Sequence, residues 1–165
     1  MNLNESTRKY ILFGIVLFIV ISVFSAKLLA KKQDTDFAKD DVLYQQATQL
    51  ASQGSYAEAA TFSSELLLRQ PNSEDVNYIS GMIAANTENY QQAAILLQKT
   101  MDINPHKIED AMFMIQFAEV LFFAERYEDA KVILEKCREW GWAPEDYPTY
   151  QERVNELLAQ IESMK

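Results

Sequence analysis

The sequence has little cysteine, glycine or proline. Of its 165 residues, one is cysteine, four are glycine and four are proline. A single cysteine excludes an internal disulfide framework. Glycine and proline interrupt helices and favour turns, so a chain with few of them is typical of a protein built from helices. The composition therefore predicts an all-α protein.

Motifs for catalysis and cofactor binding are also absent. The sequence contains no glycine-rich phosphate loop, no GxSxG segment and no HExxH segment. His106 is the one histidine, and it has no second histidine or cysteine nearby, so we expect no metal site. Cys137 falls in a predicted helix, where we expect it to pack like a small apolar residue. We predict that the chain is not an enzyme and needs neither a cofactor nor a small-molecule substrate.

Positive charge is scarce outside the N-terminal region. Residues 1–32 contain five basic residues and one acidic residue, whereas residues 33–165 contain 10 basic and 23 acidic residues. An acidic surface is repelled by phosphate groups, so we do not expect nucleic acid as a partner.

The longest apolar run is YILFGIVLFIVISVFS, residues 10–25, which contains no charged residue. Lys27 follows this run, and counted past it through Ala30 the segment is 21 residues long, which corresponds to about 30 Å of helix and is enough to cross a bilayer. We predict a transmembrane anchor over residues 10–30. The anchor would separate a short tail from a polar linker, residues 1–9 and 31–39.

A cleavable signal peptide is the alternative interpretation of this segment. Arg8 and Lys9 would form its basic start, and residues 23–25 resemble a cleavage site. The basic residues on the two flanks do not determine the orientation clearly. Because a short basic tail before an apolar run is typical of signal anchors, we expect a single-pass membrane protein whose larger part is exported. The opposite orientation remains open.

The rest of the sequence repeats. An aromatic residue followed three positions later by alanine marks three blocks, residues 54–72, 88–106 and 125–142. Tyr56 and Tyr90 are 34 residues apart, and the same interval separates Pro71 from Pro105. Tyr90 and Tyr127 are 37 residues apart, which indicates an insertion of three residues near 104–110. A fixed period of this length indicates stacked helical hairpins.

This spacing resembles the tetratricopeptide repeat (TPR) family over residues 40–142. The family needs a small residue midway along each helix of a hairpin, and this sequence has Ala47, Gly81 and Ala118 in the first helices and Ala59, Ala93 and Ala130 in the second. Small residues let two helices approach closely where they cross. Gln46 and Ser80 depart from the pattern, because leucine is usual at their position. The resemblance implies an α-solenoid of about three hairpins over residues 40–146.

Residues 147–165 are predicted to form a capping helix. Its apolar residues share one face at helical spacing: Tyr150, Val154, Leu157, Leu158 and Ile161. We expect this face to cover the third hairpin, because the last repeat of a stack needs a cap. Binding of a partner helix is the alternative.

The resemblance also implies a protein-binding groove lined by the first helices of the repeats. Carried onto this chain, its inward positions include Tyr44, Thr48, Tyr78, Met82, Ile115, Glu119 and Phe122. None of these residues is basic, which argues against an acidic peptide tail as the ligand. Methionine and aromatic side chains adapt well to apolar anchors, so we expect a protein partner with an apolar or aromatic-anchored segment. Because neighbouring helix positions differ by about 100°, one of Phe122 and Phe123 is expected to lie in the core.

Together, these features predict a membrane-tethered adaptor or scaffold subunit of a membrane-associated complex, since tethering raises the effective concentration of a partner. The alternative is a chaperone-like holder of exported polypeptides. An adaptor would co-purify with its partner in stoichiometric amounts, whereas a holder would carry many substoichiometric clients.

Overall fold

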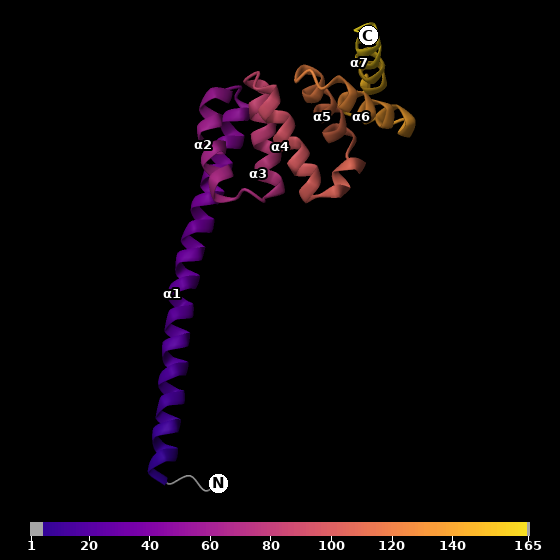
Figure 1. Cartoon of the computed structure of the whole chain (residues 1–165). Helices are drawn as coiled ribbons and strands as arrows, with labels where there is room; N and C mark the ends of the chain where they lie inside the picture. Colours follow the sequence, from indigo (N-terminus) through magenta and orange to yellow (C-terminus); the bar gives the residue numbers. More distant parts are fainter. Residues whose placement is uncertain (1–4, 165) are drawn as a thin grey trace. The chain divides into compact units, whose positions relative to one another are not determined.

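All regular elements of the computed structural model, which describes residues 5–164, are helices (Figure 1). They are α1 (Glu5–Ser52), α2 (Tyr56–Arg69), α3 (Glu74–Asn86), α4 (Tyr90–Ile103), the 3₁₀ helix η1 (Pro105–Glu109), α5 (Ala111–Phe123), α6 (Tyr127–Trp140) and α7 (Tyr150–Ser163). Parts of the predicted tail and cap, residues 1–4 and 165, lie outside the described residues.

The chain divides within α1 into two units, residues 1–42 and 43–165. Residues 31–39, expected to form a linker, are helical and belong to α1. Residues 15–53 contain neither glycine nor proline, so no residue there breaks the helix. The polar composition of residues 31–39, which lack apolar periodicity, therefore did not indicate a loop.

The transmembrane anchor predicted over residues 10–30 is not supported. A bilayer span needs about 20 consecutive apolar residues in one helix, and within the described residues no helix is both long and apolar enough to meet that requirement. The predicted location, a single-pass membrane protein with an exported repeat domain, is wrong on the same finding. The apolar run does form helix, but it is one part of the longer α1.

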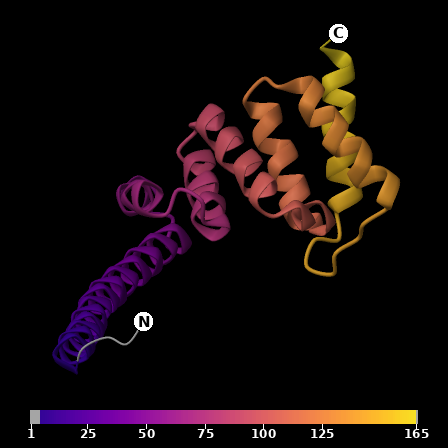
Figure 2. The ribbon, with the colours of Figure 1, turned by 60° about the horizontal axis from the view of Figure 1, so that its bottom comes forward.

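Residues 43–164 form the predicted stack of helical hairpins (Figure 2). The end of α1 is followed by α2, α3 pairs with α4, and α5 pairs with α6. The helix α7 packs against α6 and also contacts α5. We call residues 43–164 the repeat body.

Small residues allow the helices of the repeat body to cross closely, as the sequence predicted. Five of the six predicted crossing residues are alanines with no exposed surface, Ala47, Ala59, Ala93, Ala118 and Ala130. The sixth, Gly81, is buried in α3. A larger side chain at any of these positions would push two helices apart.

The three turns inside the hairpins have the same backbone structure. In each turn, the residue two positions before the tyrosine has a positive φ: 78° at Gly54, 61° at Glu88 and 60° at Glu125. Each turn also contains the same 2.9 Å hydrogen bond, in which the next N–H donates to a carbonyl five residues earlier: Ser55 to Leu50, Asn89 to Ala84, and Arg126 to Leu121. This Schellman arrangement ends the first helix of each hairpin and fixes the entry to the second.

The buried apolar side chains form two clusters. The smaller one lies among α1, α2 and α3 and comprises Leu43, Ala47, Ala59, Leu66, Val76 and Ile83. The larger one extends through α4, α5, α6 and α7. It includes the apolar face of α7, because Tyr150, Val154, Leu157, Leu158 and Ile161 are all buried there. This burial explains why an amphipathic helix follows the last hairpin.

The inserted residues after α4 form η1. Asn104 caps η1 through its side-chain oxygen, which accepts a hydrogen bond from His106 N at 3.2 Å, and Pro105 occupies the first helical position. At the other end, the Asp110 carboxylate accepts from Phe113 N at 3.0 Å and so caps α5. The insertion therefore adds an ordered connection between the second and third hairpins.

Candidate functional site

A cavity of about 300 Å³ lies between α3 and α5. Its lining residues are Met82, Ala85, Asn86, Tyr90, Gln116, Glu119, Val120 and Phe123, and we call this site the α3–α5 groove. Met82 and Glu119, both predicted as groove residues, lie together here. The volume is at the lower end of the range typical of ligand pockets, which suits one or two side chains of a partner.

The two adjacent phenylalanines of α5 have opposite environments. Phe122 is 9% exposed and packs edge-on against Tyr127, with ring centroids 5.5 Å apart. Phe123 is 48% exposed, lines the groove and stacks on Tyr90 with centroids 5.1 Å apart. One of the pair does lie in the core, as expected, but it is Phe122, the residue assigned to the groove from the sequence.

Ile115, also assigned to the groove, is 1% exposed and belongs to the larger core cluster. On α5 the residues that line the groove are Gln116, Glu119 and Phe123. Their spacing of three and four residues places them on one side of a helix. The sequence had predicted Ile115, Glu119 and Phe122 at these positions. The first and the last of the three are therefore displaced by one residue, and Glu119 is shared.

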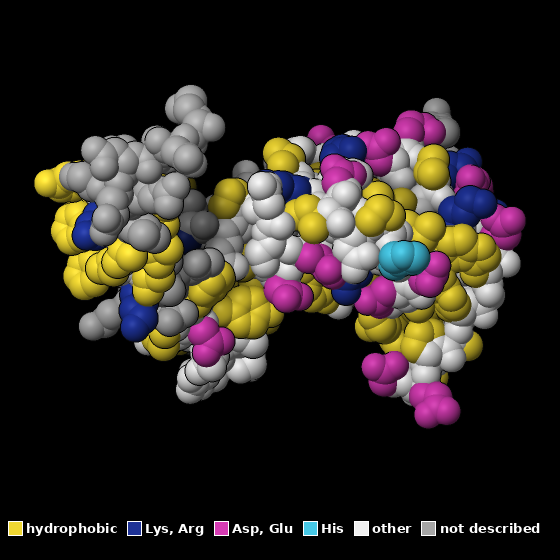
Figure 3. Space-filling model, turned by 90° about the horizontal axis from the view of Figure 1, so that it is seen from below, with side chains coloured by type: hydrophobic (Ala, Val, Ile, Leu, Met, Phe, Trp, Pro, Cys, Tyr) yellow, Lys and Arg dark blue, Asp and Glu magenta, His cyan; other side chains and the backbone are white. Residues whose placement is uncertain are grey.

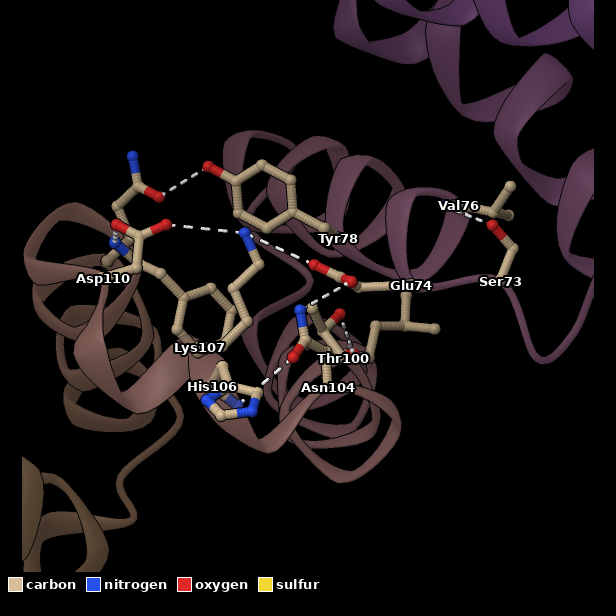
Figure 4. A network of polar contacts seen from close by, with 12 residues as sticks. Ser73, Glu74, Val76, Tyr78, Thr100, Asn104, His106, Lys107 and Asp110 are labelled. Carbon is tan, nitrogen blue, oxygen red and sulfur yellow. Dashed lines mark hydrogen bonds and ion pairs between the residues drawn. The ribbon is translucent and has the colours of Figure 1, made fainter.

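Tyr78 lies beside the groove and is held by three kinds of contact (Figure 4). Its hydroxyl donates a 2.8 Å hydrogen bond to Gln116 Oε1. Its ring lies 6.0 Å from that of Phe113, and Lys107 Nζ lies 5.5 Å from the Tyr78 ring centroid, within the range of a cation–π contact. Burial is the main cause that raises the pKa of Tyr78, and the nearby Asp110 carboxylate raises it further.

Lys107 is a site residue that sequence reasoning missed. It comes from η1, and its ammonium lies 3.4 Å from Glu74 Oε1 and 3.4 Å from Asp110 Oδ2 (Figure 4). Burial opposes its charge, but the bonds to Glu74 and Asp110 outweigh that effect and raise the pKa of Lys107. Asn104 completes this contact by donating to Glu74 Oε2 at 2.9 Å. The three-residue insertion was the only signal in the sequence that pointed to this region.

A second charged contact lies at the Glu119 side of the groove. Arg153 of α7 donates from Nε to Glu119 Oε1 at 2.6 Å and from Nη1 to Glu156 Oε2 at 2.8 Å. The hydrogen bond to Glu119 is the main cause that raises the pKa of Arg153. The capping helix therefore contributes to the environment of the groove, a role that its amphipathic pattern did not predict.

The remaining predicted groove residues, Tyr44 and Thr48, lie on the last turns of α1. Thr48 is exposed and its hydroxyl donates to the Tyr44 carbonyl at 2.9 Å. Tyr44 is half-buried; burial raises the pKa of its hydroxyl, and the carboxylate of Asp75 adds to the effect. Neither residue lines the α3–α5 groove.

The groove offers surface for non-covalent binding. In the described part of the chain, no group of three or more histidine, cysteine and acidic residues could hold a metal ion. The His106 side chain is 85% exposed and lies 3.6 Å from Glu109. Cys137 is fully buried, as predicted, and burial raises the pKa of its thiol, which disfavours the reactive thiolate.

No protein-family model matches the sequence, and no curated protein matches it either. Solved structures do match the fold. SycD of Yersinia enterocolitica, a type III secretion chaperone in complex with a peptide of the translocator YopD, is 18% identical, with 75% of this chain and 92% of that chain covered at a TM-score of 0.59. The TPR2B domain of yeast Sti1, in a complex with pHsp70, is 13% identical, with 77% and 98% covered at 0.59.

An O-GlcNAc transferase of Thermobaculum terrenum also matches, at 20% identity and a TM-score of 0.59, but only 22% of that chain is covered, against 74% of this one. Identities this low show the fold alone. The fold is a TPR-like stack of helical hairpins, and the same fold occurs in chaperones, in binding domains and as part of an enzyme. Function must therefore be argued from the groove itself.

Proposed function

We propose that this chain binds segments of other polypeptides in the α3–α5 groove and acts as a chaperone-like holder, with exported polypeptides as its clients. The observation that carries the proposal is the cavity between α3 and α5, where the soft apolar side chain of Met82 and the exposed ring of Phe123 lie together. Surfaces of this kind accept varied apolar anchors, because methionine adapts its shape and aromatic rings bury a large area.

The small volume of the groove favours a holder over a dedicated adaptor. A cavity of about 300 Å³ is at the lower end of the range for ligand pockets and accommodates one or two anchoring side chains. Binding through few anchors is suited to transient contact with many segments. The complex of SycD with a YopD peptide is an instance in which a protein of similar fold holds a segment of a translocator.

Site-specific photo-crosslinking tests this proposal. Phe123 is replaced by the photoreactive amino acid p-benzoylphenylalanine in the full chain, and the adducts formed in cells are identified by mass spectrometry. A matched control carries the same probe at Val132, which is 62% exposed but lies on α6, away from the groove residues. We expect several client proteins, each in substoichiometric amount, to crosslink at position 123 and not at position 132.

Other results would contradict the proposal in different ways. Equal adducts at both positions, or none at position 123, would show that the α3–α5 groove is not the binding surface. One stoichiometric partner at position 123 would retain the groove but would favour the adaptor function over the holder.

A further inference from the structure

We infer that the segment bound in the α3–α5 groove carries lysine or arginine next to its apolar anchor. This inference rests on the proposed function, and it adds the charge of the client to the apolar character already expected. It is carried by two charged clusters that are connected to the groove, and each of them contains two acidic groups and one basic group.

The first cluster joins Glu74, Lys107 and Asp110. The Lys107 ammonium lies 3.4 Å from each carboxylate, so one positive charge is shared between two negative ones. The Lys107 side chain is only 23% exposed, whereas the Asp110 side chain is 43% exposed. The cation is therefore largely covered while a carboxylate faces solvent, and the cluster presents negative charge to an approaching partner.

The second cluster joins Glu119, Arg153 and Glu156. Here the Arg153 guanidinium bonds both carboxylates, at 2.6 Å and 2.8 Å. Its side chain is 26% exposed, against 54% for Glu156. The imbalance is the same as in the first cluster, because two carboxylates share one cation.

Direct contacts connect both clusters to the apolar groove. Glu119 belongs to the second cluster and also lines the groove. Gln116 lines the groove and accepts the hydrogen bond of Tyr78, whose ring lies under Lys107 of the first cluster. An anchor seated on Met82 and Phe123 would consequently share the groove with the Glu119 carboxylate, and the first cluster is connected to the same groove through Tyr78 and Gln116. Figure 3 shows both acidic and basic side chains among exposed hydrophobic ones on one face of the repeat body.

The charges of the two clusters favour one class of client over another. A segment with acidic residues beside its anchor would meet like charge at both clusters, whereas lysine or arginine would meet opposite charge. Asp75 is exposed, and its carboxylate contributes to the raised pKa of Tyr44. It follows Glu74 in the first turn of α3 and so adds to the negative charge of that helix. The chemistry of the site therefore fits an apolar anchor flanked by basic residues.

Fluorescence anisotropy with three designed peptides tests the inference on the full chain. The peptides share a central Leu-x-x-Phe pair and differ only in two flanking residues on each side, which are lysine, glutamine or glutamate. At low salt we expect the lysine peptide to bind about tenfold more tightly than the glutamine peptide and the glutamate peptide to bind most weakly. At about 0.5 M salt the difference should largely vanish, since salt screens exposed charges.

Variants locate the effect. Glu119→Gln and Asp110→Asn each remove one negative charge beside the groove, and asparagine at 110 retains the capping function for α5. Each should weaken the lysine peptide about threefold, and Asp110→Asn, which changes no residue that lines the groove, should leave the glutamine peptide unchanged. The matched control is Glu139→Gln, which removes the same charge from an exposed side chain on α6 and should change neither affinity. Thermal melts confirm that each variant is folded.

The outcomes separate the inference from the proposed function. If all three peptides bind equally and Phe123→Ala weakens all of them, the groove binds clients but the basic flank is wrong. If Glu139→Gln weakens the lysine peptide as much as Glu119→Gln does, the attraction comes from the overall charge, and the inference is also overturned. If no peptide binds, or if Phe123→Ala changes nothing, the proposed function fails together with the inference.

Discussion

Gly81 of α3 lies directly against Leu97 of α4. A Cβ atom at position 81 would be 3.0 Å from both Cγ and Cδ2 of Leu97, and 3.4 Å from Cβ of Leu96. Leu97 has no exposed surface and so has little room to move. The second hairpin therefore closes to a distance that only glycine allows without a shift of its neighbour.

Gly81→Val should destabilise the repeat body by about 1–3 kcal/mol, because it overpacks this crossing. Gly14→Val is a suitable control, since no atom lies within 4 Å of a Cβ built at Gly14. Urea unfolding followed by circular dichroism measures both free energies of unfolding. If Gly81→Val unfolds at the same urea concentration as the parent chain, the crossing has been described wrongly.

Tyr78 contributes to stability as well as to the site. Tyr78→Phe removes only the hydrogen bond to Gln116 and should cost about 1 kcal/mol, whereas Tyr78→Ala also removes the contacts with Phe113 and Lys107 and should cost more. Thermal melts of the two variants give the comparison. Equal melting temperatures for Tyr78→Phe and Tyr78→Ala would mean that the ring contacts contribute nothing.

The equivalent turns predict stabilising substitutions. Glu88 and Glu125 adopt positive φ values where the first turn has Gly54, and a residue with a Cβ atom is strained in that region. Glu88→Gly and Glu125→Gly should each stabilise the chain by about 0.5–1 kcal/mol, and Gly54→Ala should destabilise it by a similar amount. Denaturant midpoints of the three variants test this, and a destabilised Glu88→Gly would refute the explanation by strain.

Stability should fall at alkaline pH. Burial is the main cause that raises the pKa of Tyr150, whose hydroxyl donates to the Ala111 carbonyl at 3.0 Å, and burial likewise raises the pKa of Cys137. Groups with raised pKa keep their protons in the folded chain while the unfolded chain loses them. The free energy of unfolding is therefore at its full value below the pKa values of these groups in the unfolded chain, about 8.5 for cysteine and 10 for tyrosine. It falls as the pH rises above those values.

Urea unfolding at pH 7, 9 and 10.5 measures this loss. For Tyr150→Phe we expect a lower stability at pH 7, because the hydrogen bond to Ala111 is lost, but a smaller further decrease between pH 9 and 10.5. A pH dependence identical to that of the parent chain would show that Tyr150 does not titrate with unfolding.

The hairpin register could be predicted from the sequence because it depends on residue size. Ala59 and Ala93, assigned to helix crossings by their place in a 34-residue period, have no exposed surface. The groove could be predicted only in part. Met82 and Glu119 line it, but a rotation of α5 by one position exchanges Phe122 for Phe123, and such a rotation depends on tertiary packing against α6 and α7.

Two other features were beyond the reach of sequence pattern. Lys107 of η1 contacts Glu74, which lies 33 positions earlier in the chain. The insertion in the sequence shows that additional residues are present, but it does not show which residues they contact. The apolar run at residues 10–30 indicated helix correctly. It did not establish a membrane span, for which the described residues contain no suitable helix.

The division of the core into two clusters implies that the repeat body opens from one end. The cluster among α1, α2 and α3 contains few large side chains, whereas the cluster from α4 to α7 includes Phe113, Phe117 and Tyr150. Regions with less buried apolar surface open at lower free energy. Backbone amides of α2 should therefore exchange their hydrogens with solvent sooner than those of α5, so that Tyr44 and Thr48 fluctuate while the α5 side of the groove, at Phe123, keeps its shape.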